Sequence, residues 1–276
     1  MLLRISSLLL LCATTVESAN YLMYSPMFGR SRANYLGRLA DVLVEGGHNV
    51  TIIGPVIDST LGTYGSKRVK GDKIIVVPQA PFVKNKEPDL IAMIHEVWRN
   101  QGPMQLIKAF ATIGEVMRAQ CNATLKDENM WAELRKNEFD VGFGEGLDMC
   151  GFIIFRKLGI KKTALTMSVA TTEGSFDMTG NPSFPSYVPG AAGSSIDVMS
   201  FSERMFNTIS ILITKRIFPS MIEPYRDLAE AHFVGDKFPT MMVIRRIQTG
   251  VILEKEQLKD GVALESALRE VLGNEK

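Results

Sequence analysis

Apolar residues in the first third of the chain follow two different periods. The runs at 21–24 and 50–53 are short and continuous, as in buried strands. Between them Leu36, Leu39, Ala40, Leu43 and Val44 recur at helical spacing. Ser31 stands where a helix N-cap is expected, and two glycines at 46–47 end the pattern. Strand, helix and strand over such a length form the unit of a parallel doubly wound sheet.

The same alternation continues along the rest of the chain. Strands are predicted at 73–77, 139–143 and 163–167, and helices at 88–136, 147–158 and 201–232. Residues 171–200 are rich in Gly, Pro and Ser, which predicts a long loop. The pattern therefore predicts an α/β fold with a Rossmann-like doubly wound parallel sheet.

Ligand sites in such sheets lie beyond the carboxyl ends of the strands. In this chain that rule selects the loop Ser25–Arg32, the segment Gly144–Leu147 and the loop that starts at Ser168. We expect these three segments to surround one cleft.

Composition narrows the class of protein further. The chain has 276 residues, a net charge of +1, 46% hydrophobic and 22% charged residues. This length allows one large domain or two modest ones, each with a substantial core. A nucleic-acid partner is not expected because there is no basic excess, and the composition is not that of a disordered chain.

Residues 1–18 have the pattern of a secretory signal peptide: Arg4, a short apolar core and small residues before Ala19. A retained anchor is the weaker alternative, since the core is shorter than a bilayer span. We therefore expect the secretory pathway, either the endoplasmic reticulum lumen or secretion. Removal of the peptide leaves Cys121 and Cys150, which form a disulfide or remain two buried thiols.

No second membrane segment is predicted, because the apolar stretch 205–219 contains Lys215 and Arg216 and fits an amphipathic helix. Membrane association is therefore expected only through partners. Two glycosylation sequons start at Asn49 and Asn122. Asn49 begins a run that should be a buried strand, so Asn122 is the better predicted acceptor.

The three histidines have no spacing that suggests a metal site. His48 lies in a helix-to-strand turn, His95 on an apolar helical face and His232 near the end of a helix. Each is interpreted as a structural or surface residue. No glycine-rich phosphate fingerprint is convincing, so no cofactor and no metal are expected.

Seven short motifs together carry a family resemblance. They are Ser25-Pro-Met-Phe-Gly-Arg-Ser31, Asn34-Tyr-Leu-Gly-Arg-Leu-Ala-Asp41, Gly47-His-Asn-Val-Thr51, Phe139-Asp-Val141, Cys150-Gly-Phe152, Pro185-Ser-Tyr-Val-Pro-Gly190 and Met199-Ser-Phe-Ser-Glu-Arg204. In this order they resemble the N-terminal half of the UDP-glucuronosyltransferases, specifically the nematode type. The resemblance implies a two-lobed GT-B glycosyltransferase fold, in which residues 19–240 form the lobe that holds a small lipophilic acceptor.

The resemblance also implies site residues. The family carries a His directly after a Ser in the loop beyond the first strand, where it takes the proton of the acceptor hydroxyl; the matching residue here is Arg32. The family Asp that orients this His falls on Glu145, with Asp148 as fallback. An arginine cannot act as general base, so we expect a structural, bidentate ion pair with the carboxylate. The acceptor-binding positions are assigned to Phe28, Ser31, Tyr35 and Ser168.

Beyond Thr240 the resemblance jumps to a strip of the UDP-sugar lobe, so residues 241–276 are interpreted as a remnant of that lobe, with no donor-binding residue. We expect a truncated isoform or a gene-model error, with a poorly packed tail. The family activity is transfer of a glycosyl group from a UDP-sugar co-substrate to a lipophilic hydroxyl, and this chain is expected to lack turnover by itself. The alternative is a non-catalytic acceptor-binding lobe or a regulatory partner of full-length family members.

Overall fold

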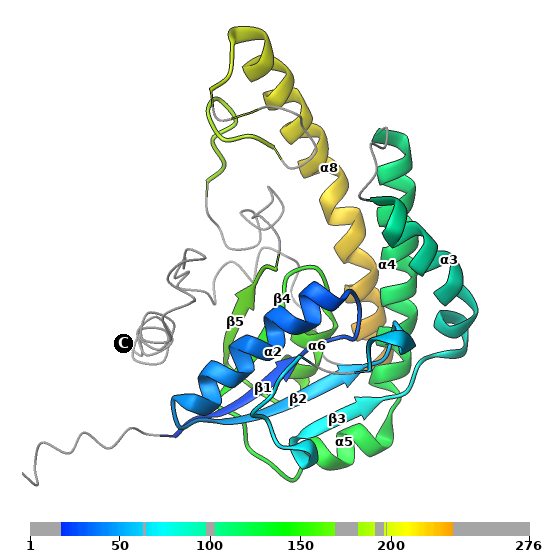
Figure 1. Cartoon of the computed structure of the whole chain (residues 1–276), viewed down its shortest axis with the longest axis vertical. Coiled ribbons are helices and arrows are strands. Elements are labelled where there is room, and N and C mark those ends of the chain that lie inside the picture. Colours follow the sequence, from blue (N-terminus) through cyan, green and yellow to red (C-terminus); the bar gives the residue numbers. More distant parts are fainter. Residues whose placement is uncertain are drawn as a thin grey trace, which may run out of the picture.

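A computed structural model describes residues 18–62, 65–97, 103–168, 182–190, 196 and 198–233. In this part of the chain one five-stranded sheet has the order β3-β2-β1-β4-β5 (Figure 1). The strands are β1 (Asn20–Tyr24), β2 (Asn49–Pro55), β3 (Ile74–Val77), β4 (Val141–Glu145) and β5 (Lys162–Thr166). All neighbouring pairs are parallel, which confirms the predicted Rossmann-like α/β fold.

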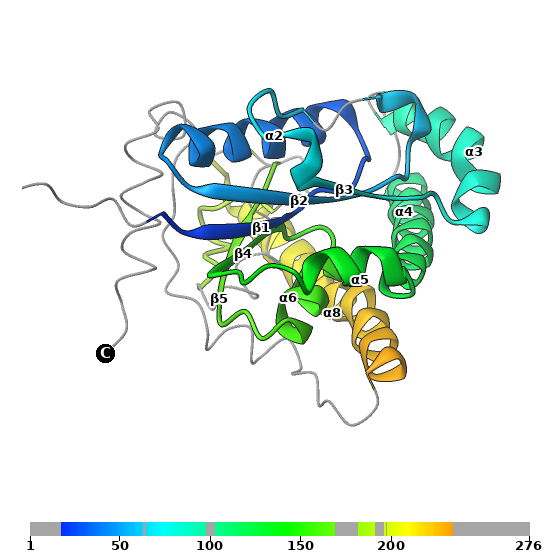
Figure 2. The same cartoon turned by 90° about the horizontal axis from the view of Figure 1, so that it is seen from below.

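Helices cover both faces of the sheet. They are α2 (Arg30–Glu45), α3 (Pro81–Val97), α4 (Pro103–Leu125), α5 (Glu128–Leu134), α6 (Cys150–Lys157) and α8 (Phe201–His232), with 3-10 turns at Ser59–Leu61 and Gly71–Lys73. Helix α2 lies on one face, and α5, α6 and the C-terminal part of α8 lie on the other (Figure 2). The N-terminal part of α8 extends away from the sheet (Figure 1).

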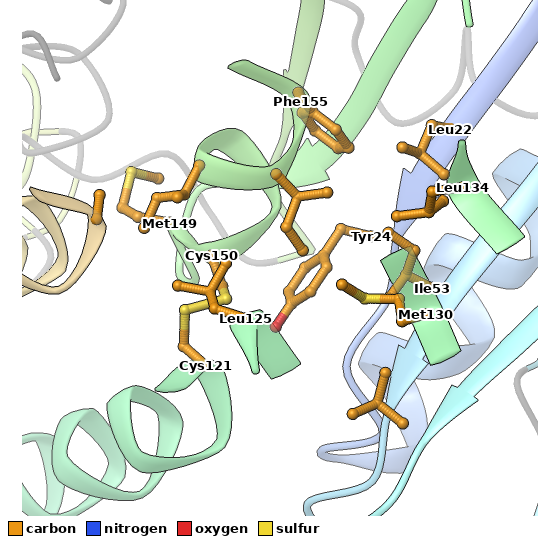
Figure 3. Packing of buried hydrophobic residues seen from close by; sticks show 14 of the residues in the cluster. Leu22, Tyr24, Ile53, Cys121, Leu125, Met130, Leu134, Met149, Cys150 and Phe155 are labelled. Carbon is orange, nitrogen blue, oxygen red and sulfur yellow. A yellow bond between two sulfur atoms is a disulfide. The ribbon is translucent and has the colours of Figure 1, made fainter. Parts of the chain in front are cut away.

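The alternation of side chains along β1 divides the core in two. Tyr21 and Met23 pack with the apolar face of α2. Leu22 and Tyr24 point the other way, into the cluster formed with α4, α5 and α6 (Figure 3). Both faces of β1 are therefore buried, as expected for a central strand of a parallel sheet.

Several predicted boundaries are wrong. Helix α2 begins at Arg30, so Ser31 lies in its first turn; the N-cap is Gly29, whose φ of 73° is accessible to glycine. Helix α3 begins at Pro81 instead of 88, because proline fits the first turn of a helix. The predicted strand at 139–143 is displaced to Val141–Glu145 in β4, which makes Glu145 the last residue of a strand.

Other sequence-based expectations fall outside the described residues. These are the signal peptide, most of the loop predicted at 171–200, the side chain of His95 and the tail 241–276. The domain boundary at 240 therefore stays a prediction. Among the described residues we find no helix with the length and apolar character that crossing a membrane requires.

Candidate functional site

The parallel register brings three predicted segments to one edge of the sheet. Tyr24 at the end of β1 pairs with Gly144, and Glu145 at the end of β4 pairs with Thr166 at the end of β5. From β1 the chain passes through residues 25–29 into α2, which places Arg32 in the first turn of that helix. The carboxyl ends of β1, β4 and β5 therefore carry the candidate site, as the sequence predicts.

Arg32 and Glu145 form a buried ion pair at this edge. The side chains are 7% and 0% exposed, and Arg32 Nε donates a hydrogen bond to Glu145 Oε2. The predicted pairing of these two residues is confirmed. Because both charges are removed from water, each depends on the other for compensation.

The pair is not bidentate, contrary to the sequence-based expectation. Among the described residues Arg32 Nη2 has no hydrogen-bond partner although it is buried. The second carboxylate oxygen, Glu145 Oε1, instead accepts hydrogen bonds from Ser168 N, at 3.0 Å, and from Ser168 Oγ. Competition from Ser168 thus leaves Arg32 with a single contact to Glu145.

The predicted acceptor-binding residues have different surroundings. The half-buried Phe28 ring lies with its centroid 6.0 Å from Arg32 Cζ, and Ser168 binds Glu145, so both belong to the site. The Tyr35 hydroxyl lies 2.6 Å from Thr166 Oγ1, next to the end of β5. Ser31 is exposed on the first turn of α2.

Asp148 is a second buried carboxylate beside the pair, and it is only 2% exposed. Its Oδ1 accepts a hydrogen bond of 3.0 Å from Cys150 N at the start of α6. Burial raises the pKa of Asp148 from 3.8 to about 6, against the opposing effects of the Cys150 N–H and the Arg32 charge. The sequence identified Asp148 only as an alternative to Glu145, whereas the structure places both residues in the same cluster.

Two tyrosines complete the cluster and were not predicted. Tyr24 from β1 and Tyr225 from α8 both interact with Asp148. Burial raises the pKa of each phenol well above its usual value, and the charge of Asp148 raises it further. Both phenols therefore stay protonated. No sequence signal indicates that α8 returns to the end of β1, because this is a tertiary contact.

We expect Asp148→Asn to change the pH dependence of stability. A carboxyl whose pKa is raised in the folded state stabilises that state fully below about pH 4, and this contribution is lost as pH rises through about 6. The free energy of unfolding of the variant, relative to that of wild type, should therefore be about 2–3 kcal/mol higher at pH 7 than at pH 4. Urea unfolding at both pH values measures this, with exposed Asp89→Asn on α3 as the control. A stability difference that is the same at both pH values would contradict a buried, titrating Asp148.

Cys121 and Cys150 are joined by a disulfide, which decides between the two alternatives left by the sequence. The bond connects α4 to the first residue of α6 and lies inside the apolar cluster (Figure 3). Cys150 N also donates a hydrogen bond to Asp148, so one residue of the disulfide directly holds this buried carboxylate.

The reason for preferring Asn122 as a glycosylation site does not hold. Asn49 is exposed, although the rest of its strand is buried. Asn122 is half-buried within α4, and its Oδ1 lies 2.8 Å from His232 Nε2. On exposure alone, Asn49 is the more accessible sequon.

The histidines that the structure describes have structural contacts. His48 Nδ1 accepts a hydrogen bond of 3.2 Å from Ala19 N, which ties the turn before β2 to the start of β1. Burial lowers the pKa of His232, and the charge of Lys126 lowers it further. Among the described residues there is no group of three His, Cys, Asp or Glu that could hold a metal ion.

Comparison with known proteins finds relatives among the UDP-glycosyltransferases. The family profile described as UDP-glucoronosyl and UDP-glucosyl transferase matches residues 23–248. A Caenorhabditis briggsae protein named UDP-glucuronosyltransferase ugt-47 is 26% identical over 256 residues, 93% of this chain and 47% of the relative. Rattus norvegicus UDP-glucuronosyltransferase 1A7 is 25% identical over 229 residues, which are 80% of this chain and 41% of that protein.

A solved structure, that of the glycotransferase of kitacinnamycin, matches with a TM-score of 0.39 and 12% identity over 83% of this chain and 44% of that one. The chain spans about half the length of the curated relatives it matches. Because the family profile covers most of the sequence, including both members of the Arg32–Glu145 pair, the chain belongs to the UDP-glucuronosyl and UDP-glucosyl transferase family.

Proposed function

We propose that this chain provides the acceptor side of a UDP-glycosyltransferase and binds a small lipophilic compound at the carboxyl ends of β1 and β4. We further propose that it takes no proton from that compound at the family's base position. The observation that carries the proposal is the buried Arg32–Glu145 ion pair at this position.

The chemistry of glycosyl transfer explains why the ion pair matters. An acceptor hydroxyl forms a bond to C1 of the sugar, UDP leaves with its bonding electrons, and the hydroxyl proton must pass to a base. A guanidinium has no lone pair that can receive this proton. Both oxygens of Glu145 are already engaged, one by Arg32 and one by Ser168. The arrangement therefore supports binding without the family's proton transfer.

We propose a sugar donor and a cellular location as well. A UDP-sugar would be a co-substrate held by the other lobe, as in the family, and no resident cofactor is needed. The signal-like residues 1–18 and the disulfide between Cys121 and Cys150 support the lumen of the secretory pathway.

Binding and turnover of one fluorescent phenol test the proposal together. We expect purified protein to bind 2-naphthol but to yield no naphthyl glycoside with UDP-glucuronate or UDP-glucose, as measured by fluorescence titration and mass spectrometry. Glycoside formation that disappears in Glu145→Gln would show that the site does act as a base. Failure to bind 2-naphthol or any matched compound would reject the acceptor-binding role.

One observation favours a second candidate function, the regulation of full-length family members by association. Six apolar side chains that are about half to four-fifths exposed share one face of the N-terminal part of α8: Phe201, Met205, Phe206, Ile209, Leu212 and Ile213. A continuous apolar surface of this kind usually marks an interaction site. We infer that this face packs against a relative of the same family.

Co-precipitation with a full-length relative tests this second candidate. Phe206→Ser/Ile209→Ser should abolish association, because it makes the centre of the apolar face polar. Thr214→Ala, on the opposite side of the same helix, is the matched control. Equal recovery of the relative with both variants would reject the α8 face as the contact.

A further inference from the structure

The two glycosylation sequons of the chain lie in opposite surroundings. Both have the pattern that N-glycosylation requires, at Asn49-Val-Thr51 and at Asn122-Ala-Thr124. An N-linked oligosaccharide is bulky and hydrophilic, so the folded protein can hold one only where the asparagine side chain reaches solvent. The surroundings of each asparagine therefore show which sequon is compatible with the fold.

Asn49 is exposed at the amino end of the sheet. It is the first residue of β2, and its backbone N–H donates a hydrogen bond of 3.0 Å to Ala19 O, so the sheet fixes its main chain. Its side-chain Nδ2 donates to Asn20 Oδ1 at 3.0 Å and to Ser18 Oγ at 3.5 Å, and both bonds are exposed. Water can replace such bonds at little cost. Because all strands are parallel, this end of the sheet is opposite the candidate ligand site.

Asn122 faces another helix. It is half-buried on α4, and its Oδ1 lies 2.8 Å from Nε2 of His232, the last residue of α8. Thr124 of the same sequon is fully buried, and its Oγ1 donates a hydrogen bond of 2.9 Å to Gln120 O. Because Asn122 Nδ2 belongs to the same planar amide as Oδ1, a sugar on this nitrogen would collide with the end of α8.

The end of α8 cannot move aside without the loss of buried contacts. Tyr225 and Ala229, which are 5% and 1% exposed, belong to the apolar cluster that also contains residues of β1 and α6. Directly after the helix, the Phe233 ring lies edge-on to Trp131, with 5.8 Å between the ring centroids. Exposing this apolar surface is unfavourable. A glycan on Asn122 and the docked position of α8 therefore exclude each other.

We propose that the folded protein carries one N-linked glycan, on Asn49, and that a glycan on Asn122 prevents docking of α8. The inference rests on the proposed location in the secretory pathway, where the donor is an oligosaccharide joined to a membrane lipid through a diphosphate. Asn49 Nδ2 forms a bond to C1 of the first sugar while the bond from C1 to the diphosphate oxygen breaks. The amide loses one proton, and the electron pair leaves with the lipid diphosphate.

The two positions have different consequences for the proposed functions. A glycan on Asn49 is at the end of the sheet away from Arg32 and Glu145, so it leaves the ligand site open and α8 in place. A molecule modified at Asn122 instead loses α8 from the sheet and exposes the apolar side chains that the helix covers. Such surfaces favour aggregation. Use of the second sequon therefore yields a non-native molecule.

Cell-free translation of the full chain with endoplasmic reticulum microsomes tests location and modification separately. Wild type should be protected from external protease and should carry one glycan, seen as a gel shift that a glycosidase reverses. After solubilisation, the trypsin-resistant protein of Asn49→Gln should lack this glycan completely. Thr51→Val destroys the same sequon while retaining the asparagine and should give the same loss. Asn122→Gln is the matched control and should keep the glycan.

The outcomes separate the glycan from the location on which it depends. Protected wild-type protein without a glycan would overturn the assignment to Asn49 and leave the location intact. Protein that the external protease digests would reject the location, and the glycan with it. A glycan in the trypsin-resistant protein that persists in Asn49→Gln and disappears in Asn122→Gln would overturn the exclusion by α8. A glycan on Asn122 found only in trypsin-sensitive molecules would support that exclusion.

Discussion

Arg32→Gln is expected to lower the free energy of unfolding by about 3–5 kcal/mol. The substitution leaves Glu145, which is 1% exposed, buried without its counter-charge. Ser168 still donates to one carboxylate oxygen, but a neutral hydrogen bond does not replace a cation. Urea unfolding monitored by circular dichroism gives the free energy directly.

Arg30→Gln is the matched control, because Arg30 lies on the same turn of α2 and is exposed. Its effect should stay within about 0.5 kcal/mol. If Arg32→Gln cost no more than this control, the pair would not be buried as described, and its charges would not depend on each other.

Cys121→Ala/Cys150→Ala is the second change with a large expected effect, a loss of about 2–5 kcal/mol in the free energy of unfolding. The disulfide closes a loop between residues 29 positions apart and joins α4 to α6. Its loss frees the unfolded chain and loosens the start of α6, where Cys150 N holds Asp148. Thermal and urea unfolding of the oxidised protein and the variant measure the difference.

Wild-type protein unfolded in the presence of a reductant is the control for the two side-chain truncations. It should lose most of the same stability, because reduction breaks the bond and retains the sulfur atoms. Free thiols at both positions in a peptide map of oxidised protein, with unchanged stability in reductant, would contradict the disulfide.

Periodicity was sufficient to predict most of the fold. The strands near 21–24 and 50–53 and the helix between them were predicted because continuous apolar runs and helical spacing differ clearly there. The errors occurred where local rules compete. Gly29 replaces Ser31 as N-cap because a glycine with positive φ turns the chain before the serine is reached. Pro81 opens α3 because its ring fits a first turn.

The candidate site was partly predictable for a similar reason. Arg32 follows β1 and Glu145 ends β4, and the parallel topology brings these strand ends together. The contact of Glu145 with Ser168 arises because Ser168 follows β5, the strand next to β4 in the sheet. Tyr225 could not be found in this way, because its position depends on how the long helix α8 packs back on the sheet, and no periodicity encodes that contact.

The central claim is that Arg32 and Glu145 form one buried, mutually dependent pair at the family's base position. A double-mutant cycle of Arg32→Gln and Glu145→Gln, read by urea unfolding, tests it most directly. The pair predicts a coupling of about 2–3 kcal/mol, so that the double variant is far less destabilised than the two single effects added together. Additivity of the two substitutions to within about 0.5 kcal/mol would contradict it.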